Sequence, residues 1–535
     1  MKQVLALLIV FFCIAGLSAT PQELAIFRIA PFLEFTGCTD LAVALQKPVA
    51  SDIELYYHND KFVIAGLSSA CLATFPRGMI AKTLKLPHPG KLYLSSVEPQ
   101  IAAASSTRNA RLVYDMETVS LYESDLSILE LRKESAQQFT PLRMVPVKLF
   151  PEYRTVYPVE ERNPVISGLV NQVNPDSVIW FIQSLENFQT RFCLADNRLA
   201  VSEWIRDQFY RFGITDVGLH VFDMNGYLQY NVVATIPGTE NPDKYIVVGG
   251  HHDSIVYPGD PLIFAPGADD NATGTAAALE MARVMKSQNY QPRNSIRFIT
   301  FAAEEAGLYG SWAYASEAAL AQQDIILMIN HDMIGTSNQT PDVWQVKISP
   351  YSGYVDYTLK AMQLTEQYTS LTPTLADMNS SNSDSFCFWL NDYPVTYFKE
   401  FDFSPYYHST QDLTIHVNAD FCAEVIKAST AVAVTYGNML PAPRMLWTTD
   451  TGTGSSLLVS WPNSPSPDLA SYKIYHNNHG SYFDNPISVS VQPGELTSHT
   501  ITGLPEGQAC YIAVSSVAVN GDESSKVYGL GTPYS

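Results

Sequence analysis

The sequence predicts an α/β protein whose central part is a three-layer sandwich, with a mostly parallel sheet between two layers of helices. Apolar strands alternate with helical segments from about residue 165 to residue 438, as in folds with a parallel central sheet. Polar residues gather where these strands end, which is where ligands bind in open α/β sheets. Short apolar stretches between turn residues predict a β-rich N-terminal domain over 20–150 and a C-terminal β-sandwich over 441–535.

Length, composition and charge limit the class of protein. A chain of 535 residues is too long for one hydrophobic core, so several domains are expected. With 46% hydrophobic and 16% charged residues, the chain is globular rather than disordered. A net charge of -21 argues against a nucleic-acid partner, because phosphate binding needs a basic face. We interpret the acidity as a soluble surface, with some of the carboxylates available as metal ligands.

The first nineteen residues have the features of a signal peptide. Lys2 gives a basic start, the apolar run Val4–Leu17 follows, and the small residues Ser18 and Ala19 suit a cleavage site. This run is shorter than the roughly 18 residues that a membrane span needs. We therefore expect cleavage after residue 19 and a secreted or periplasmic protein without a membrane span.

The cysteines that remain after cleavage do not suggest a metal site. None of them forms a CxxC pair, so zinc bound by thiolates is not expected. An exported chain can form disulfides, and Cys38 with Cys71 is one possible pair.

The elements of the α/β part follow from caps and apolar runs. An N-cap signal at Asn174-Pro175-Asp176 begins one helix, and a second helix over 200–212 stops at Gly213. A further amphipathic helix is expected over 272–287. The expected strands cover 230–236, 245–248, 295–301, 325–329 and 394–398.

The first polar cluster follows the strand 245–248. His251 and Asp253 lie on one face of an extended segment and His252 lies on the other. A metal-bound imidazole needs an acceptor for its second nitrogen, so His251 as ligand with Asp253 as its orienting partner fits this spacing. Taken alone, the same residues also suit a surface loop.

Two acidic pairs follow. Asp269 and Asp270 precede the helix over 272–287, where acidic residues are common as N-caps, but nearby glycines favour a close backbone approach. Glu304 and Glu305 end the strand 295–301, where adjacent carboxylates repel each other unless a cation is bound. One of the two glutamates would then be a ligand and the other a base.

The last two clusters complete the set. Asp332 follows the strand 325–329 and is a candidate ligand, whereas its neighbour His331 is not. His408 is a candidate ligand after the strand 394–398, and Tyr407 beside it is a candidate donor to an oxyanion. Each alone suits a plain loop, but together they indicate a metal centre.

In this order, the five motifs resemble those of the zinc-dependent exopeptidase family of secreted bacterial aminopeptidases, which also includes glutamate carboxypeptidases and glutaminyl cyclases. The resemblance covers roughly residues 165–438 and implies a mixed eight-stranded sheet and two Zn²⁺ ions per chain. It assigns His251 and Asp332 to one zinc, Glu305 and His408 to the other, Asp270 to both, Glu304 as general base and Tyr407 as the group that polarises the carbonyl. The family's bridging aspartate lies three residues before a small residue and a glycine, here Thr273-Gly274, which selects Asp270 over Asp269. The family also implies a cis peptide bond between Asp270 and Asn271.

The resemblance implies an aminopeptidase, in which a metal-bridging hydroxide attacks the peptide bond. A carboxypeptidase shares the same metal centre and stays an alternative. Glutaminyl cyclases bind one zinc, and the full ligand set argues against them. The flanking domains would suit an inactive binding protein, but the intact Glu304, Glu305 and Tyr407 favour an enzyme with peptide substrates.

The roles of the flanking domains are less determined. Trp461, the alternating strand Tyr472–Tyr475 and the turn Leu504–Gly507 resemble a fibronectin type III module, which would bind a surface, a polysaccharide or a protein. The N-terminal domain is either a propeptide that covers the site or a permanent adhesion module. We expect a monomer.

Overall fold

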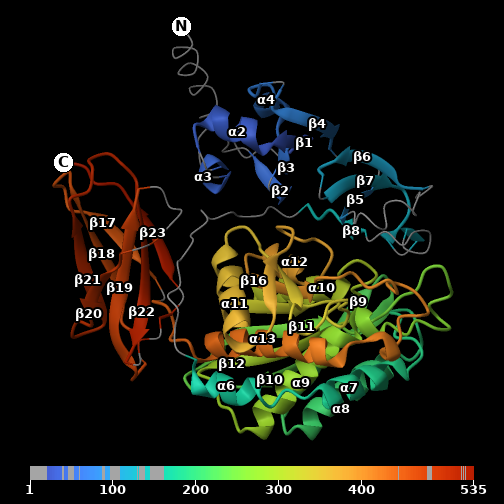
Figure 1. Ribbon diagram of the computed structural model, residues 1–535. Helices are drawn as coiled ribbons and strands as arrows, with labels where there is room; N and C mark the ends of the chain where they lie inside the picture. Colours follow the sequence, from blue (N-terminus) through green and yellow to red (C-terminus); the bar gives the residue numbers. More distant parts are fainter. Residues whose placement is uncertain are drawn as a thin grey trace.

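The computed structural model describes residues 21–535 except 39–40, 46–52, 60, 77, 87–90, 97–108, 118, 129, 132–138, 145–161, 444, 465, 479–482, 484, 520, 522 and 525. The predicted signal peptide therefore lies outside the described residues. Figure 1 shows the β-rich N-terminal part and the C-terminal β-sheets beside a larger α/β part. In the part of the chain that the structure describes, no helix combines the length and the apolar character that crossing a membrane requires.

The α/β part contains one eight-stranded mixed sheet, in the order β15-β14-β16-β13-β11-β12-β10-β9. The inner strands β12, β11, β13 and β16 run parallel, whereas β9 and β10 at one edge and the β14–β16 pairing near the other are antiparallel. The bounds are β9 Asp216–Met224, β10 Tyr227–Ile236, β11 Asn241–His251, β12 Asn294–Phe301, β13 Asp324–His331, β14 Gln345–Ser349, β15 Thr372–Leu375 and β16 Val395–Glu400. The predicted three-layer α/β fold with a mixed central sheet is confirmed.

Helices cover both faces of this sheet because its inner strands are apolar on both sides. In β11, Ile246 and Val248 face one core, while Val247 between them faces the other. The first core is shared with α6 Pro164–Val170, α7 Pro175–Glu186, α8 Arg198–Arg211, α9 Thr273–Ser287, α11 Val355–Tyr368 and α13 Ala419–Asn438. The second is shared with α10 Tyr309–Leu320 and α12 Ser385–Trp389, and it continues into the N-terminal part.

The N-terminal part forms two four-stranded sheets, β2-β3-β1-β4 and β6-β7-β5-β8 (Figure 1). We call its described residues between 21 and 144 the N-terminal module. Its strands are β1 Glu23–Arg28, β2 Glu54–His58, β3 Phe62–Leu67, β4 Ile80–Lys85, β5 Lys91–Ser96, β6 Arg111–Asp115, β7 Val119–Ser124 and β8 Thr140–Pro141. Its short helices are α2 Ile29–Thr36, α3 Leu41–Leu45 and α4 Ser69–Leu72.

The C-terminal part has a three-stranded sheet, β17-β18-β21, and a four-stranded sheet, β20-β19-β22-β23. Trp461 and Leu457 of the first sheet share a core with Tyr472 and Ile512 of the second, so the two sheets form a sandwich. The strands are β17 Trp447–Asp450, β18 Ser456–Pro462, β19 Leu469–Asn477, β20 Ile487–Ser490, β21 Leu496–Thr502, β22 Cys510–Ala518 and β23 Val527–Gly531.

The six cysteines among the described residues are free thiols. The pairing of Cys38 with Cys71, considered possible from the sequence, is therefore not formed. Cys71 is buried in the core of the N-terminal module, where a free cysteine packs as a small apolar side chain.

Candidate metal centre

Five potential ligands from three strand ends, one π-helical turn and one loop meet at the carboxyl edge of the central sheet. His251 is the last residue of β11 and Asp332 follows β13, while Glu305 lies in the turn after β12. Asp270 lies in the short π-helical turn Ala268–Ala272 (η2), before α9. His408 comes from the loop between β16 and α13. The topology thus joins residues that are far apart in sequence.

The five expected ligands form two overlapping groups that share Asp270, and His251, Glu304 and Glu305 form a third group of possible ligand atoms. Asp270 Oδ1 lies 3.3 Å from His251 Nε2, and Asp270 Oδ2 lies 3.1 Å from His408 Nε2. His251 Nε2 is also 3.4 Å from Asp332 Oδ1, and His408 Nε2 is 3.1 Å from Glu305 Oε1. Each set, His251–Asp270–Asp332 and Asp270–Glu305–His408, brings its ligand atoms within 4.8 Å of one another. Each imidazole therefore has its own carboxylate and shares a central one.

Burial makes this cluster costly without cations. All five residues are at most 5% exposed, and carboxylates so deeply buried need positive charge nearby. Burial alone would lower the pKa of His408, but Glu305 and Asp270 outweigh it and raise this pKa to about 9. The pKa of His251 is likewise raised well above its ordinary value, against burial, by Glu304 and Asp332. The pocket favours positive charge, and its nitrogen and oxygen donors suit zinc.

Asp253 links the first ligand to the glutamate turn. Its Oδ1 lies 3.5 Å from His251 Nδ1, in the orienting position predicted from the sequence. Its backbone carbonyl is also 3.1 Å from that nitrogen. The same carboxylate accepts hydrogen bonds from the backbone N–H groups of Glu304, at 3.0 Å, and Glu305, at 3.2 Å. One side chain thus fixes the imidazole and the turn that carries both glutamates, a role the sequence analysis missed.

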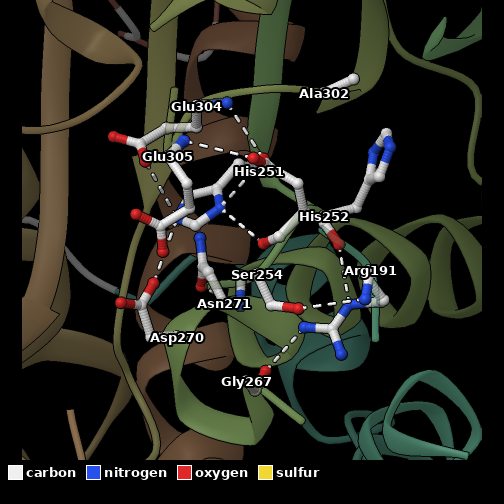
Figure 2. A network of polar contacts seen from close by, with 12 residues as sticks. Arg191, His251, His252, Ser254, Gly267, Asp270, Asn271, Ala302, Glu304 and Glu305 are labelled. Carbon is white, nitrogen blue, oxygen red and sulfur yellow. Dashed lines mark hydrogen bonds and ion pairs between the residues drawn. The ribbon is translucent and has the colours of Figure 1, made fainter. Parts of the chain in front are cut away.

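Glu304 and Tyr407 lie beside the ligands. The Glu304 side chain is fully buried, with Oε2 at 3.8 Å from His251 Nε2. Figure 2 shows Glu304, Glu305, His251 and Asp270 facing a common space, whereas the ring of His252 points away from it. The half-buried Tyr407 ring stacks on His408, with the ring centroids 3.7 Å apart. Glu304 is thus placed beside the ligand set, and Tyr407 borders it.

Two neighbouring histidines, His252 and His331, lie outside the ligand sets, as their positions in the sequence predict. His252 packs on the other side of β11, with Nδ1 at 3.1 Å from Thr300 Oγ1. His331 stacks on Phe398 and lies 3.2 Å from the carbonyl of Gly249. Burial lowers the pKa of each to about 4, so both are neutral core histidines.

Asp412 positions Asp270 through its backbone. Its carboxylate accepts the N–H groups of Asp269, at 2.9 Å, and Asp270, at 3.0 Å. Asn271 completes this support, donating from Nδ2 to the carbonyl of His331 at 2.9 Å and accepting the N–H of Gly274 at 2.8 Å. The peptide bond between Asp270 and Asn271 is cis, as predicted.

Arg191 holds two loops together from behind the site. Its guanidinium donates to the carbonyls of His252 and Gly267, each at 2.7 Å (Figure 2). It also donates to the carbonyl of Pro266 at 2.6 Å. The side chain is 2% exposed, and burial lowers its pKa to about 10. It remains protonated at neutral pH, and its N–H groups donate to backbone carbonyls.

Comparisons with known proteins place this centre in a family. Residues 231–433 match peptidase family M28. Leucine aminopeptidase 1 of Paracoccidioides brasiliensis (strain Pb03) is 30% identical over 272 residues, which are 48% of this chain and 68% of that protein. A probable zinc metalloprotease of Pyrenophora tritici-repentis is 30% identical over 239 residues, 39% of this chain and 52% of that protein. The chain spans about half the length of the probable zinc metalloproteases that it matches.

Solved structures show the same fold. The LapA aminopeptidase of Legionella pneumophila superposes with a TM-score of 0.53 at 18% identity, covering 66% of this chain and 99% of that one. LapB of the same organism gives a TM-score of 0.50 at 22% identity, covering 65% and 99%. The sequence match and the fold lead to one conclusion: the chain belongs to peptidase family M28.

Proposed function

We propose that this protein is a dinuclear zinc aminopeptidase, which removes single residues from the N-terminus of peptides. The observation that carries the proposal is the position of Asp270, whose two carboxylate oxygens face two different imidazoles at 3.3 and 3.1 Å. Asp332 accompanies the first imidazole and Glu305 the second. The arrangement supplies two adjacent sites with one shared ligand, and curated relatives are named zinc metalloprotease and leucine aminopeptidase.

The chain's own residues supply the proton transfers. Bound zinc would provide Lewis acidity and would lower the pKa of a bound water. Glu304 takes a proton from the water whose oxygen attacks the carbonyl carbon, and returns it to the amine nitrogen as the carbon–nitrogen bond breaks. Tyr407 borders the ligand set and is the candidate donor to the carbonyl oxygen. Deep burial of Glu304 keeps bulk water from competing for that proton.

Charge favours the amino end of a peptide over the carboxyl end. A carboxypeptidase needs a cation to bind the terminal carboxylate. The guanidinium that acts on Asp253, Asp270 and Asp412 is that of Arg191, and its donors already bind backbone carbonyls. This argues for an aminopeptidase, and the second ligand set argues against a cyclase with one zinc.

A pair of matched peptides tests this choice. We expect hydrolysis of leucine anilide and of a free-amine peptide, and no hydrolysis of the same peptide with an acetylated N-terminus. A chelator should abolish activity and added zinc should restore it. Release of the C-terminal residue from the acetylated peptide would support a carboxypeptidase instead. Activity that survives removal of the metal would contradict the proposal.

Zinc content tests the shared ligand. We expect about two zinc ions per chain in the wild type and a loss of both in Asp270→Ala, because this change removes a ligand from each set. Elemental analysis of the purified proteins measures this directly. Asp207 is exposed on α8, so Asp207→Ala is the matched control and should keep the zinc content of the wild type. Full zinc occupancy in Asp270→Ala would contradict the bridging role.

The same proposal includes export. The features of residues 1–19 support cleavage of a signal peptide, and mass spectrometry of the protein recovered outside the cell would give the mature N-terminus. The C-terminal sandwich is proposed to be a fibronectin type III-like module that binds or spaces. A mature protein that still begins at Met1 would contradict the export proposal.

A further inference from the structure

The turn that carries Glu304 and Glu305 is flanked by two residues in an energetically unfavourable backbone conformation. Ala303 and Leu308 have φ angles of 56° and 60°, a left-handed conformation that residues with a side chain rarely adopt. Such a conformation persists only where the surroundings hold it. From the inside, Asp253 holds the turn through the two glutamate N–H groups. Within the turn, the carbonyl of Glu304 accepts the N–H of Gly307 at 2.7 Å.

From the outside, the same turn is held by the N-terminal module. Arg143 donates from a guanidinium nitrogen to the carbonyl of Gly307 at 3.2 Å. Its guanidinium also lies over the ring of Trp312 in α10, 4.2 Å from the ring centroid. Ile128 and Pro141 of the module pack so closely on Gly307 that an added Cβ would meet each at 3.2 Å. Three residues of the module therefore enclose a glycine two positions after Glu305.

A second contact reaches the strand end that carries Asp332. Thr140 donates to the carbonyl of Ser381 at 2.6 Å, and Asn379 donates to the carbonyl of His58 at 2.9 Å. The loop that contains Asn379 and Ser381 also bonds to β13, since Asn330 Nδ2 donates to Ser383 Oγ at 2.6 Å. Asn330 lies two residues before Asp332. The module thus supports both sides of the candidate centre.

The interface between the two parts is a continuous apolar core. Tyr57 of the module meets Phe386 of α12 with ring centroids 6.3 Å apart, and His58 meets Trp389 at 5.9 Å. Tyr57, Phe386 and Trp389 are almost completely buried. Removing the module would leave an aromatic surface of α12 in water, at a cost that grows with its area.

We propose that the N-terminal module is a permanent part of the working enzyme, in which Arg143 is a positioning residue that holds the turn of Glu304 and Glu305. This rests on the proposed function, in which Glu304 is the base. A propeptide that is cut away and discarded would remove the Gly307 contacts and expose α12. The module is instead an outer support for the catalytic turn, opposite the inner support from Asp253.

Substitution of Arg143 tests the proposal in the full chain. Arg143→Ala should lower kcat by roughly 10- to 100-fold with little change in KM, because the displaced turn misplaces the base. Zinc content should stay at the wild-type value. Arg143→Lys should recover part of the loss, since an ammonium group can still donate to Gly307 but cannot stack as a plane. The matched control is Arg111→Ala, because the Arg111 side chain in the same module is 71% exposed and pairs with Glu123.

A readout independent of activity separates this inference from the proposed function. Hydrogen–deuterium exchange of a peptide covering residues 303–309 should be faster in Arg143→Ala than in the wild type and in Arg111→Ala. If the wild type cleaves no peptide, the proposed function fails, yet the exchange experiment still tests the support. Equal exchange and equal turnover in Arg143→Ala and Arg111→Ala would overturn the inference.

Two further measurements keep the test decisive. If Arg143→Ala does not fold, Ile128→Ala removes methyl contacts with Gly307 without changing charge and should give the same pattern of slower turnover and faster exchange. Mass spectrometry of the active mature protein should detect residues 21–144. A fully active mature enzyme that lacks them would overturn the inference.

Discussion

At the scale of single residues, the candidate centre divides its carboxylates between potential metal ligands and supporting groups. Asp270, Glu305 and Asp332 face the imidazoles, whereas Asp253 and Asp412 accept backbone N–H groups behind them. Burial and Asp269 raise the pKa of Asp412 well above its ordinary value. Removal of either supporting carboxylate would leave two buried N–H groups without an acceptor.

Glu304 is the residue whose role is most directly testable. Glu304→Gln keeps the shape of the side chain but removes the proton acceptor. We expect turnover of leucine anilide to fall by about 100-fold or more, while zinc content stays at the wild-type value. Steady-state kinetics and elemental analysis on the same sample measure both.

A matched control for this variant lies in α10. Glu317 has a side chain that is 63% exposed and pairs with His220, so Glu317→Gln should behave like the wild type. Near-normal turnover in Glu304→Gln would show that another group is the base. A parallel loss of zinc would show that Glu304 is a ligand instead.

The sequence indicates the candidate ligands but not their support. His251, Glu305 and Asp332 lie at or just after the ends of apolar runs, and the sequence alone reveals where such runs end. Asp412 lies four residues after His408, but the N–H group of Asp270 that it binds is 142 positions away. Arg191 has no local signature at all, because its partners are backbone carbonyls that any sequence supplies.

At the scale of elements, two glycines set how closely strand, helix and turn approach. A Cβ on Gly250 in β11 or on Gly274 in α9 would lie 2.4 Å from the carbonyl of His331. That carbonyl accepts the Asn271 side chain, so β11, β13 and α9 converge on one atom. The close approach expected from glycines around the acidic pair is found at Gly274.

In the C-terminal sandwich, Glu523 joins β19 to β22. It accepts hydrogen bonds from Lys473 Nζ at 2.8 Å, Tyr475 Oη at 2.6 Å and Ser515 Oγ at 2.6 Å. Burial raises the pKa of Glu523, but Lys526 and the hydrogen bonds outweigh this and hold it below the ordinary 4.5. A lowered folded-state pKa means that the stabilisation is present above pH 4.5 and is lost as the pH falls through the folded-state value.

Glu523→Gln tests whether the ionised side chain of Glu523 stabilises the fold at neutral pH. We expect the variant to be less stable than the wild type by about 1–3 kcal/mol at pH 7, with a difference that shrinks as the pH falls below 4.5 and the wild-type side chain takes up a proton. Calorimetric unfolding at pH 7 and at about pH 3.5 measures the difference. The exposed Glu495→Gln is the control. An equal difference at both pH values would contradict the ionic role.

Elements with long apolar runs were predictable, whereas short ones were not. The inner strands β11, β12 and β13 are buried on both faces, so their runs stand out in the sequence. The strands β14 and β15 have five and four residues, and no long run marks them. The expected helix over 272–287 begins one residue later, at Thr273, because Asp270 and Asn271 have non-helical backbone angles.

At the scale of the whole molecule, the two flanking parts attach differently. The C-terminal sandwich has its own core, and Ser466 and Ser516 make polar contacts with Glu240 and with the carbonyl of Pro441. Arg293 adds an ion pair with Asp468. The N-terminal module instead shares its core with the central sheet.

This contrast predicts opposite effects of truncation. A chain that ends at residue 443 should keep kcat within about twofold of the wild type, because the sandwich has its own apolar core and these polar contacts lie away from the candidate metal centre. Kinetics with leucine anilide and the temperature of unfolding measure the effect. A chain that lacks residues 21–144 is the comparison and should lose activity. Loss of turnover on removal of the sandwich would contradict this difference.

The architecture at this scale was only partly predictable. The α/β fold follows from alternating strands and helices, but nothing local divides the N-terminal part into two sheets. The shared core is also invisible in the sequence, because Tyr57 and Phe386 meet across more than half of the chain. Contacts of this kind depend on the finished topology and not on a pattern.

The shared core also limits how early the protein can finish folding during its synthesis. Thr140 and the Ser381 carbonyl that it binds are separated by 241 positions, and pairings so distant form late because a long loop must close first. The ribosome makes the N-terminal module early, but the aromatic surface of α12 that covers it emerges hundreds of residues afterwards. We therefore expect the interface between the N-terminal module and the α/β part to form only after α12 has been synthesised.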